Sequence, residues 1–171
     1  MDIINELGKV DSDDDARRVF KKHMDAAQLD RISQIQNLDV LRRIANAIVV
    51  CNPRKIFINT GSGEDKAFIR RLAIEKKEER PLAMENHTIH FDLAQEQGRI
   101  VDRTYYIANP EDHISSLANR MDRPTALEQV RSNLTNIMQD KIMIIGFYMR
   151  GPVGAPVSNP ALETTSSAYV A

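Results

Sequence analysis

A glycine-rich turn is the first group of residues whose types and spacing could do chemistry. The turn NTGSGED (residues 59–65) follows a short apolar run and precedes an amphipathic one. A Walker-type phosphate loop needs GxxxxGK[ST], in which the lysine reaches the phosphates, and a dinucleotide fingerprint needs a third glycine. Here Glu64 and Asp65 follow the glycines, and two carboxylates at a helix start repel phosphate. We therefore interpret the turn as a plain strand-to-helix connection.

Two histidines and the single cysteine are candidate metal ligands. If His87 and His90 lie on one strand, their spacing points them to opposite faces, so they cannot chelate one ion together. Asp92 shares a face with His90 only, and we expect one buried and one exposed histidine and no metal site. Cys51 closes an apolar run without a His or Lys beside it, which predicts a buried, inert thiol.

Arg99 is a candidate substrate residue. It follows Gly98 in a polar loop between two predicted strands. A guanidinium presents a rigid fork that binds a carboxylate bidentately, although an arginine in a loop is more commonly solvated. The segment GPVGAPVSNP (151–160) concentrates glycine and proline after a buried run, which favours a rigid connection between sheets or a close approach of the backbone to another group. The runs RRVFKK and EKKEER are typical of solvated helix faces.

Length, charge and cysteine content exclude several functions. The 171 residues give room for one ordinary domain. The 23 Lys+Arg against 24 Asp+Glu leave a net charge of −1, which disfavours a dedicated nucleic-acid binder. Hydrophobic residues make up 42% and charged residues 27%, as in globular domains. One cysteine excludes an internal disulfide framework and a four-cysteine zinc site.

Both ends of the chain bear on its setting. The acidic amino terminus has no signal-peptide pattern, and the longest apolar stretch, residues 142–149, is too short to cross a bilayer. We expect a soluble, cytoplasmic protein without a membrane partner. The last residues, SSAYVA, resemble an apolar β segment in mid-course, so we also expect a piece of a larger protein.

The first third of the sequence predicts helices. Ser12 with Asp15 fits a capping box, and apolar residues recur at helical spacing from Ala16 to Ala27. A second periodic stretch runs from Leu38 to Ile48 and ends near Asn52-Pro53, because a residue before proline disfavours the α region. Residues 1–52 are therefore predicted to be mainly helical.

Residues 53–171 follow an α/β pattern. Strands are predicted at 55–59, 87–91, 104–107 and 141–149, with residues 161–171 forming or bordering the sheet interior. One helix follows the glycine-rich turn, and another begins near Asp122 with Pro124 just inside it. The second helix is predicted to bury Leu127, Val130, Leu134, Ile137 and Met138. Continuous apolarity over 141–149 predicts a central strand covered on both faces. The fold class is α/β: amino-terminal helices, then a mixed β-sheet with packed helices.

Several stretches, in collinear order, resemble GTP-dependent phosphoenolpyruvate carboxykinases. The stretch MIIGFYMRGPVGAPVSNPALETTSSAYVA (143–171) is similar to a family segment in which an apolar strand enters a Gly-Pro loop and leaves through a Ser-Ala-Tyr-Val strand. The stretches FINTGSGEDKAFIRRLA, MENHTIHFD and QGRIVDRTYYI resemble the family's amino-terminal part, above all in archaeal-type members. The resemblance covers roughly residues 30–171 and implies that residues 1–171 are the amino-terminal, substrate-side domain.

The resemblance implies a reaction and one site residue. The family interconverts oxaloacetate plus GTP with phosphoenolpyruvate, carbon dioxide and GDP, with Mn²⁺ or Mg²⁺. Arg99 matches the family's substrate-binding arginine. The phosphate loop, the metal-ligating Lys, His and Asp, and the nucleotide-binding domain lie downstream of SAYV, and no GK[ST] occurs in this chain. We therefore expect no catalytic, cofactor-binding or metal-ligating residue among residues 1–171, and no activity of this part alone.

Two departures from the family pattern leave alternatives open. Ser166 stands where the family usually has an acidic residue, and Arg150 puts a charge before the Gly-Pro loop. These departures are compatible with a pyrophosphate-linked carboxykinase. A stand-alone, non-catalytic domain that binds a small carboxylate or a partner protein is the other alternative. Flux direction, metal identity, oligomeric state and whether the chain ends naturally at Ala171 stay open.

Overall fold

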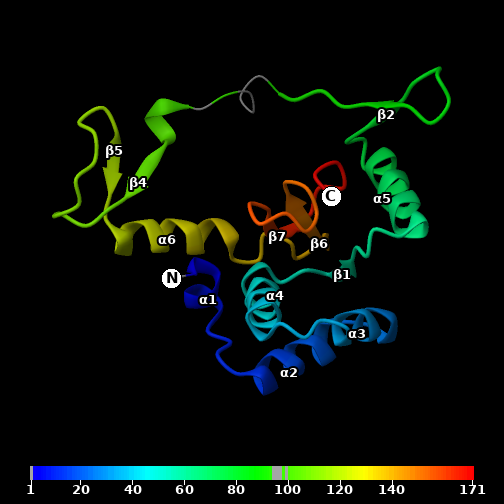
Figure 1. The fold of residues 1–171 in the computed structure, drawn as a ribbon, viewed down its shortest axis with the longest axis horizontal. Coiled ribbons are helices and arrows are strands. Elements are labelled where there is room, and N and C mark those ends of the chain that lie inside the picture. Colours follow the sequence, from blue (N-terminus) through cyan, green and yellow to red (C-terminus); the bar gives the residue numbers. More distant parts are fainter. Residues whose placement is uncertain (1, 94–97, 99) are drawn as a thin grey trace. The chain divides into compact units, whose positions relative to one another are not determined.

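The computed structural model describes residues 2–93, 98 and 100–171, and the chain divides into two compact units (Figure 1). The first unit comprises Met1–His90 and Asn136–Ala171, and the second comprises Phe91–Thr135. The helices are α1 (Ile3–Gly8), α2 (Asp13–His23), α3 (Ala26–Ser33), α4 (Leu38–Cys51), α5 (Gly63–Glu75) and α6 (Arg123–Leu134). The strands are β1 (Lys55–Ile58), β2 (Arg80–Pro81), β3 (Thr88–Ile89), β4 (Tyr105–Ile107), β5 (Asn119–Met121), β6 (Ile142–Arg150) and β7 (Asn159–Thr165).

Capping side chains determine where the amino-terminal helices begin. Ser12 Oγ accepts a hydrogen bond from Asp15 N at 3.1 Å and begins α2, as predicted. The periodic stretch that predicted one helix to Ala27 forms two helices, because Met24 is extended and Asp25 caps α3. Helix α4 ends at Cys51 and is capped by Asn52, whose φ of 49° is left-handed. Helices α1 and α2 pack on α4.

The central sheet of the first unit is mixed, with strand order β1-β6-β7. Strand β6 runs parallel to β1, with Lys55 opposite Ile142. It runs antiparallel to β7, with Ile144 opposite Thr165. Figure 1 shows α4 and α5 on opposite sides of this sheet. The predicted α/β class, with amino-terminal helices before a mixed sheet, is confirmed.

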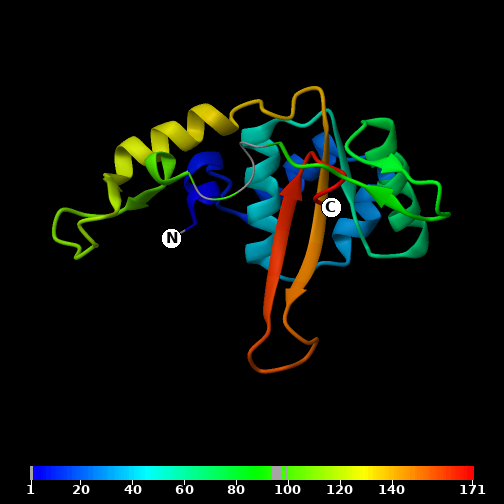
Figure 2. The same ribbon diagram turned by 90° about the horizontal axis from the view of Figure 1, so that it is seen from above.

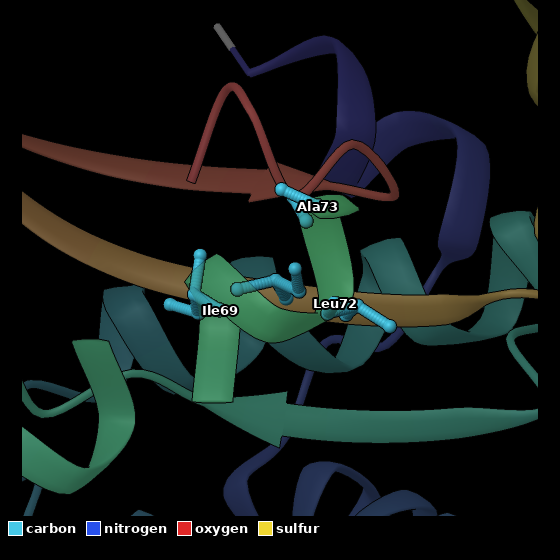
Figure 3. Packing of buried hydrophobic residues seen from close by; sticks show 5 residues of the cluster. Ile69, Leu72 and Ala73 are labelled. Carbon is cyan, nitrogen blue, oxygen red and sulfur yellow. The ribbon is translucent and has the colours of Figure 1, made fainter. Parts of the chain in front are cut away.

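One face of the sheet is covered by α5. Ile69, Leu72 and Ala73 of this helix pack against Ile144 of β6 and against Ala168 (Figure 3). Alternate side chains of a strand face opposite sides of the sheet, so burial of both faces requires a second element packed on the other face. Helix α4 lies on that second side.

Burial of β6 stops in the middle of the strand. Met143, Ile144 and Ile145 are each 0% exposed, whereas Phe147 is 43% exposed. The prediction of a strand covered on both faces is therefore correct for its first half and wrong for its second half. The cause is that β1 and the helices packed on the sheet extend along only the first half of β6. How far these neighbouring elements extend cannot be read from a run of apolar residues in β6 itself.

Three other predicted elements differ in extent. The strand predicted at 87–91 is reduced to β3, two residues long. Helix α6 ends at Leu134 because Thr135 is extended, so Ile137 lies beyond the helix and is 45% exposed. The residues after Thr165 leave β7 and form turns rather than a strand.

The second unit holds a two-stranded parallel sheet, in which Tyr105 of β4 lies opposite Asn119 of β5. Arg120 holds the connection between these strands by donating to main-chain carbonyls of Asn109, Pro110 and Asp112. Across residues 2–93, 98 and 100–171, no helix combines the length and apolarity needed to cross a membrane.

Candidate functional site

The predicted substrate residue, Arg99, lies outside the described residues. Its neighbour Gly98 has a φ of 84°, a left-handed conformation that favours glycine. The turn Val101–Arg103 then leads into β4. The role of Arg99 stays a prediction.

The glycine-rich turn after β1 is a strand-to-helix connection, as predicted. Ser62 Oγ caps α5 by accepting from Asp65 N at 3.1 Å. The carboxylate of Asp65 points inward, and this residue is only 3% exposed. It accepts from Thr60 N at 2.8 Å and Thr60 Oγ1 at 2.6 Å, and pairs with Arg31 Nη2 at 2.9 Å. Asp65 therefore ties the turn to α3 instead of facing an incoming anion.

The electrostatics of Asp65 match this structural role. Burial alone raises the pKa of its carboxyl, but hydrogen bonds from Thr60 and Arg31 outweigh burial and leave the pKa below its ordinary value. Arg31 Nη1 also donates to Ile58 O at 2.5 Å, and Arg31 Cζ lies 5.2 Å from the centre of the Phe57 ring. The ionised pair thus fixes the shape of residues 59–65.

A hollow of about 660 Å³ lies where β1 gives way to this turn. Lys66 and Arg70, one helical turn apart on α5, bring positive charge to its wall, and Glu79 brings negative charge. The remaining lining is Asn59, Thr60, Gly61, Ala67, Ile69, Phe147, Tyr148, Ala168, Tyr169 and Ala171. The hollow therefore combines aromatic and aliphatic surface with a small positive excess.

A carboxylate holds the turn that follows β7. Glu78 Oε2 accepts from Ser167 Oγ at 2.8 Å and from Tyr169 N at 2.9 Å. Lys76 Nζ donates to Ser166 O at 2.6 Å. The run EKKEER is therefore not only a solvated helix face: α5 ends at Glu75, and the next residues bind the end of the chain.

The two histidines have separate surroundings. His87 is exposed, with Nδ1 at 2.8 Å from Glu85 O. His90 is half-buried: its Nδ1 lies 2.6 Å from Glu78 O, and its ring stacks on Tyr169 with centroids 3.6 Å apart. In the part of the chain that the structure describes, no three His, Cys, Asp or Glu side chains gather to hold a metal ion. Cys51 is buried, and burial raises the pKa of its thiol.

The Gly-Pro segment is a hairpin connection. It joins β6 to β7 within one sheet, and not one sheet to another (Figure 2). Gly151 and Gly154 have φ of 108° and 81°, and Ser158 Oγ donates to Pro152 O at 2.5 Å. Val153 is 89% exposed, so this connection covers no core.

Sequence reasoning missed the residues that organise the hollow and its surroundings. Arg31 meets Asp65 across 34 positions, and Glu78 meets Tyr169 across 91 positions. Tyr148 Oη donates to Ala171 O at 2.9 Å. Charged residues in helices and charge runs carried no signal that these particular ones are half-buried or paired.

Comparisons with known proteins give a consistent result. The family model of the phosphoenolpyruvate carboxykinase N-terminal domain matches residues 42–171. A protein of Thermococcus sibiricus named "Phosphoenolpyruvate carboxykinase [GTP]" is 38% identical over 89% of this chain and 24% of its own length. Proteins of the same name from Pyrococcus furiosus and Sulfurisphaera tokodaii are 32% and 37% identical, over 91% and 82% of this chain. The chain spans about a quarter of the length of these relatives.

Proposed function

Because the chain belongs to the phosphoenolpyruvate carboxykinase N-terminal domain family, we propose that it is the substrate-side part of a GTP-dependent phosphoenolpyruvate carboxykinase. Such an enzyme converts oxaloacetate and GTP to phosphoenolpyruvate, carbon dioxide and GDP. In this proposal it acts in the cytoplasm, as an enzyme of gluconeogenesis. The observation that supports the proposal is the family match over 42–171 together with relatives of that name.

In this proposal Arg99 grips a carboxylate of oxaloacetate or phosphoenolpyruvate. Decarboxylation leaves an enolate that must be held in place until the phosphoryl group arrives, and a bidentate guanidinium contact restrains the substrate through that step. GTP and the divalent metal, Mn²⁺ or Mg²⁺, bind to the nucleotide-binding part of the enzyme. The described residues of this chain offer no metal-ligating group of three, so we derive no step from them through the metal.

A pyrophosphate-linked carboxykinase is the second candidate. It is supported by the two departures from the family pattern that the resemblance implies, Ser166 in place of an acidic residue and Arg150 before the Gly-Pro loop. A phosphoryl-donor comparison decides between the two: activity of the full-length enzyme with GTP supports the first proposal, and activity with pyrophosphate supports the second.

Substitution of Arg99 tests the role assigned to it. In the full-length enzyme, Arg99→Ala removes a charge-assisted contact of roughly 1.5–3 kcal/mol. The kcat/KM for oxaloacetate is expected to fall about ten- to a hundredfold in steady-state assays, since each 1.4 kcal/mol is about tenfold. The KM for GTP stays near its original value.

Arg99→Lys is the matched control, because an ammonium keeps the charge and loses the planar fork. It is expected to recover part of the lost kcat/KM. Unchanged kcat/KM in Arg99→Ala, or an effect confined to nucleotide binding, contradicts the proposal.

A further inference from the structure

The central sheet leaves one side of β6 uncovered. Strand β6 has nine residues, Ile142–Arg150, but β1 pairs only with residues 142–145. The last hydrogen bond on that side joins Asn59 N to Ile145 O at 2.8 Å. Beyond it the chain turns away into α5, so among the residues that the structure describes the second half of β6 has a strand neighbour on the β7 side only.

The direction of the main-chain groups follows from this bond. Both polar groups of one residue point to the same side of a strand, and successive residues alternate. Because Ile145 faces β1, Phe147 and Met149 direct their N–H and C=O groups toward the uncovered side. Gly146 and Tyr148 face β7. The open edge of β6 is thus defined by Phe147 and Met149.

Exposed edge strands commonly carry prolines, charges or bulges, which protect them against pairing. From Gly146 to Met149 the open edge of β6 has no proline and no charged residue, and its first charge is Arg150 at the end of the strand. The outer edge of β7 has Pro160 at an outward position, which removes a donor. The open edge of β6 instead carries Phe147, Tyr148 and Met149, which are 43%, 36% and 40% exposed.

Space for additional side chains lies beside the same edge. Phe147 and Tyr148 line the hollow of about 660 Å³, together with the residues that follow β1. The apolar part of its lining, which includes Ile69, Phe147 and Tyr148, suits alternate apolar side chains of an extended segment, whose main chain would complete the ladder along β6. A row of main-chain donors and acceptors beside this apolar part of the hollow fits a strand better than a small molecule.

We propose that the open edge of β6 receives a β segment from the remaining, carboxyl-terminal part of the full-length carboxykinase. This inference rests on the proposed function. The matching family model is an amino-terminal domain, and the Thermococcus relative has only 24% of its length covered, so most of such a protein follows this part. The segment pairs with Phe147 and Met149 and places apolar side chains in the hollow.

Amide hydrogen exchange at single residues tests the proposal on this chain and on the full-length enzyme. In the 171-residue chain, the amides of Phe147 and Met149 exchange quickly, while those of Gly146 and Tyr148 are protected by β7. In the full-length enzyme, Phe147 and Met149 slow by about a hundredfold or more, and Gly146 and Tyr148 stay slow. Equal, fast exchange of Phe147 and Met149 in both proteins overturns the proposal.

A second copy of the chain is the competing occupant. Protection of Phe147 and Met149 that already appears in the 171-residue chain and grows with its concentration identifies that copy and overturns the proposal. Hydrogen exchange can be measured whether or not the enzyme is active. If the full-length protein has no carboxykinase activity but Phe147 and Met149 are protected, the proposed function is rejected and the docking of a β segment on β6 remains supported.

A pair of proline variants provides a matched control. Met149→Pro removes an outward donor from the open edge of β6, and Leu162→Pro removes one from the outer edge of β7. Met149→Pro is expected to increase exchange at Phe147 at least about tenfold in the full-length enzyme, and Leu162→Pro to leave it unchanged. If both variants increase exchange at Phe147 equally, the added segment does not pair specifically with the open edge of β6.

Discussion

At the scale of single residues, the pair formed by Asp65 and Arg31 decides the shape of the turn after β1. A carboxylate that is 3% exposed is tolerated because two hydrogen bonds from Thr60 and the guanidinium of Arg31 compensate its loss of water. These bonds fix Thr60 at the wall of the hollow, next to Asn59, whose N–H is held by Ile145 O. The pair is thus a positioning contact, with consequences for stability that depend on pH.

Asp65→Asn is expected to lower the free energy of unfolding at pH 7 by roughly 1.5–3 kcal/mol, because the variant loses a charge-assisted contact. The folded-state pKa of Asp65 lies below its ordinary value of 3.8, so its contribution is complete above that value and is lost as pH falls through the folded pKa. The difference between original and variant therefore shrinks as the pH drops below about 3.8.

Urea denaturation at pH 7 and at acid pH measures this difference. Asp30→Asn, a change at an exposed position on the same helix as Arg31, serves as control and is expected to have little effect. A constant difference at all pH values is incompatible with the assigned pKa direction.

Residue roles were predictable from the sequence where the partner is local. The Ser12 cap and the buried Cys51 depend on neighbours within a few positions, and both predictions are confirmed. The Ser62 cap is equally local, but the sequence interpretation placed Ser62 only in a turn. Asp65 was interpreted only as a negative charge at a helix start that repels phosphate. Its buried pairing was missed, because its partner Arg31 is 34 positions away and nothing in one sequence pairs them. Arg99 has no structural outcome, since it lies outside the described residues.

At the scale of elements, a buried amide on α4 binds both α1 and the residues that follow it. Asn46 is 0% exposed, and its Nδ2 donates to Asn5 Oδ1 of α1 at 2.9 Å. Its Oδ1 accepts from Val10 N at 2.7 Å, and its Nδ2 also donates to Val10 O at 3.1 Å. Gly8 ends α1 directly against this residue. A Cβ at Gly8 would lie 2.7 Å from Asn46 Cα, closer than real contacts allow.

Gly8→Ala is therefore expected to destabilise the chain by roughly 1–3 kcal/mol, because α1 must move away from α4. Gly63→Ala is the control, since a Cβ there meets nothing within 4 Å. It starts α5 and is expected to be stabilising by about 0.4–1 kcal/mol. Thermal unfolding of both variants measures the contrast, and equal melting temperatures contradict the packing described for α1.

Element type was more predictable than element extent. Helical periodicity predicted α2, α4 and α5, because one face of each must be buried. The second half of β6 and the segment after Thr165 were predicted to form or border the sheet interior on apolarity alone. Ala168 does pack against the sheet, at 3% exposure, whereas Phe147, Tyr169 and Val170 are exposed. The difference depends on how far β1 and α5 extend, which is a property of the assembled sheet and not of the segment itself.

At the scale of the whole molecule, this chain is a quarter of the length of its relatives and contains no GK[ST] sequence. The 171-residue chain is expected to show no saturable binding of GTP or GDP at millimolar concentration in calorimetry, because binding of phosphates needs a phosphate loop or an equivalent cradle. The full-length enzyme from Thermococcus sibiricus is the positive control. A 1:1 isotherm with the chain alone would contradict the division of roles proposed above.

Family membership was predictable from the collinear order of several stretches rather than from one motif. The family model covers 42–171, within the range of roughly 30–171 over which the resemblance was noted. No single stretch is a catalytic motif. The open edge of β6 was not predicted, because it arises from β6 being longer than its neighbour β1, which the sequence of β6 does not show.

The parallel pairing of β1 with β6 also governs the order in which the chain can fold. Lys55 and Ile142 are 87 positions apart, and the entire second unit lies in the loop between them. The hairpin of β6 and β7 closes locally and can form within microseconds, whereas β1 must wait for a long loop to close. Each doubling of loop length costs about 0.6 kcal/mol, a factor of about three. Replacing residues 91–135 by a short linker, which roughly halves the loop, is therefore expected to raise the refolding rate about threefold in stopped-flow experiments; an unchanged rate would place closure of β1 after the rate-limiting step.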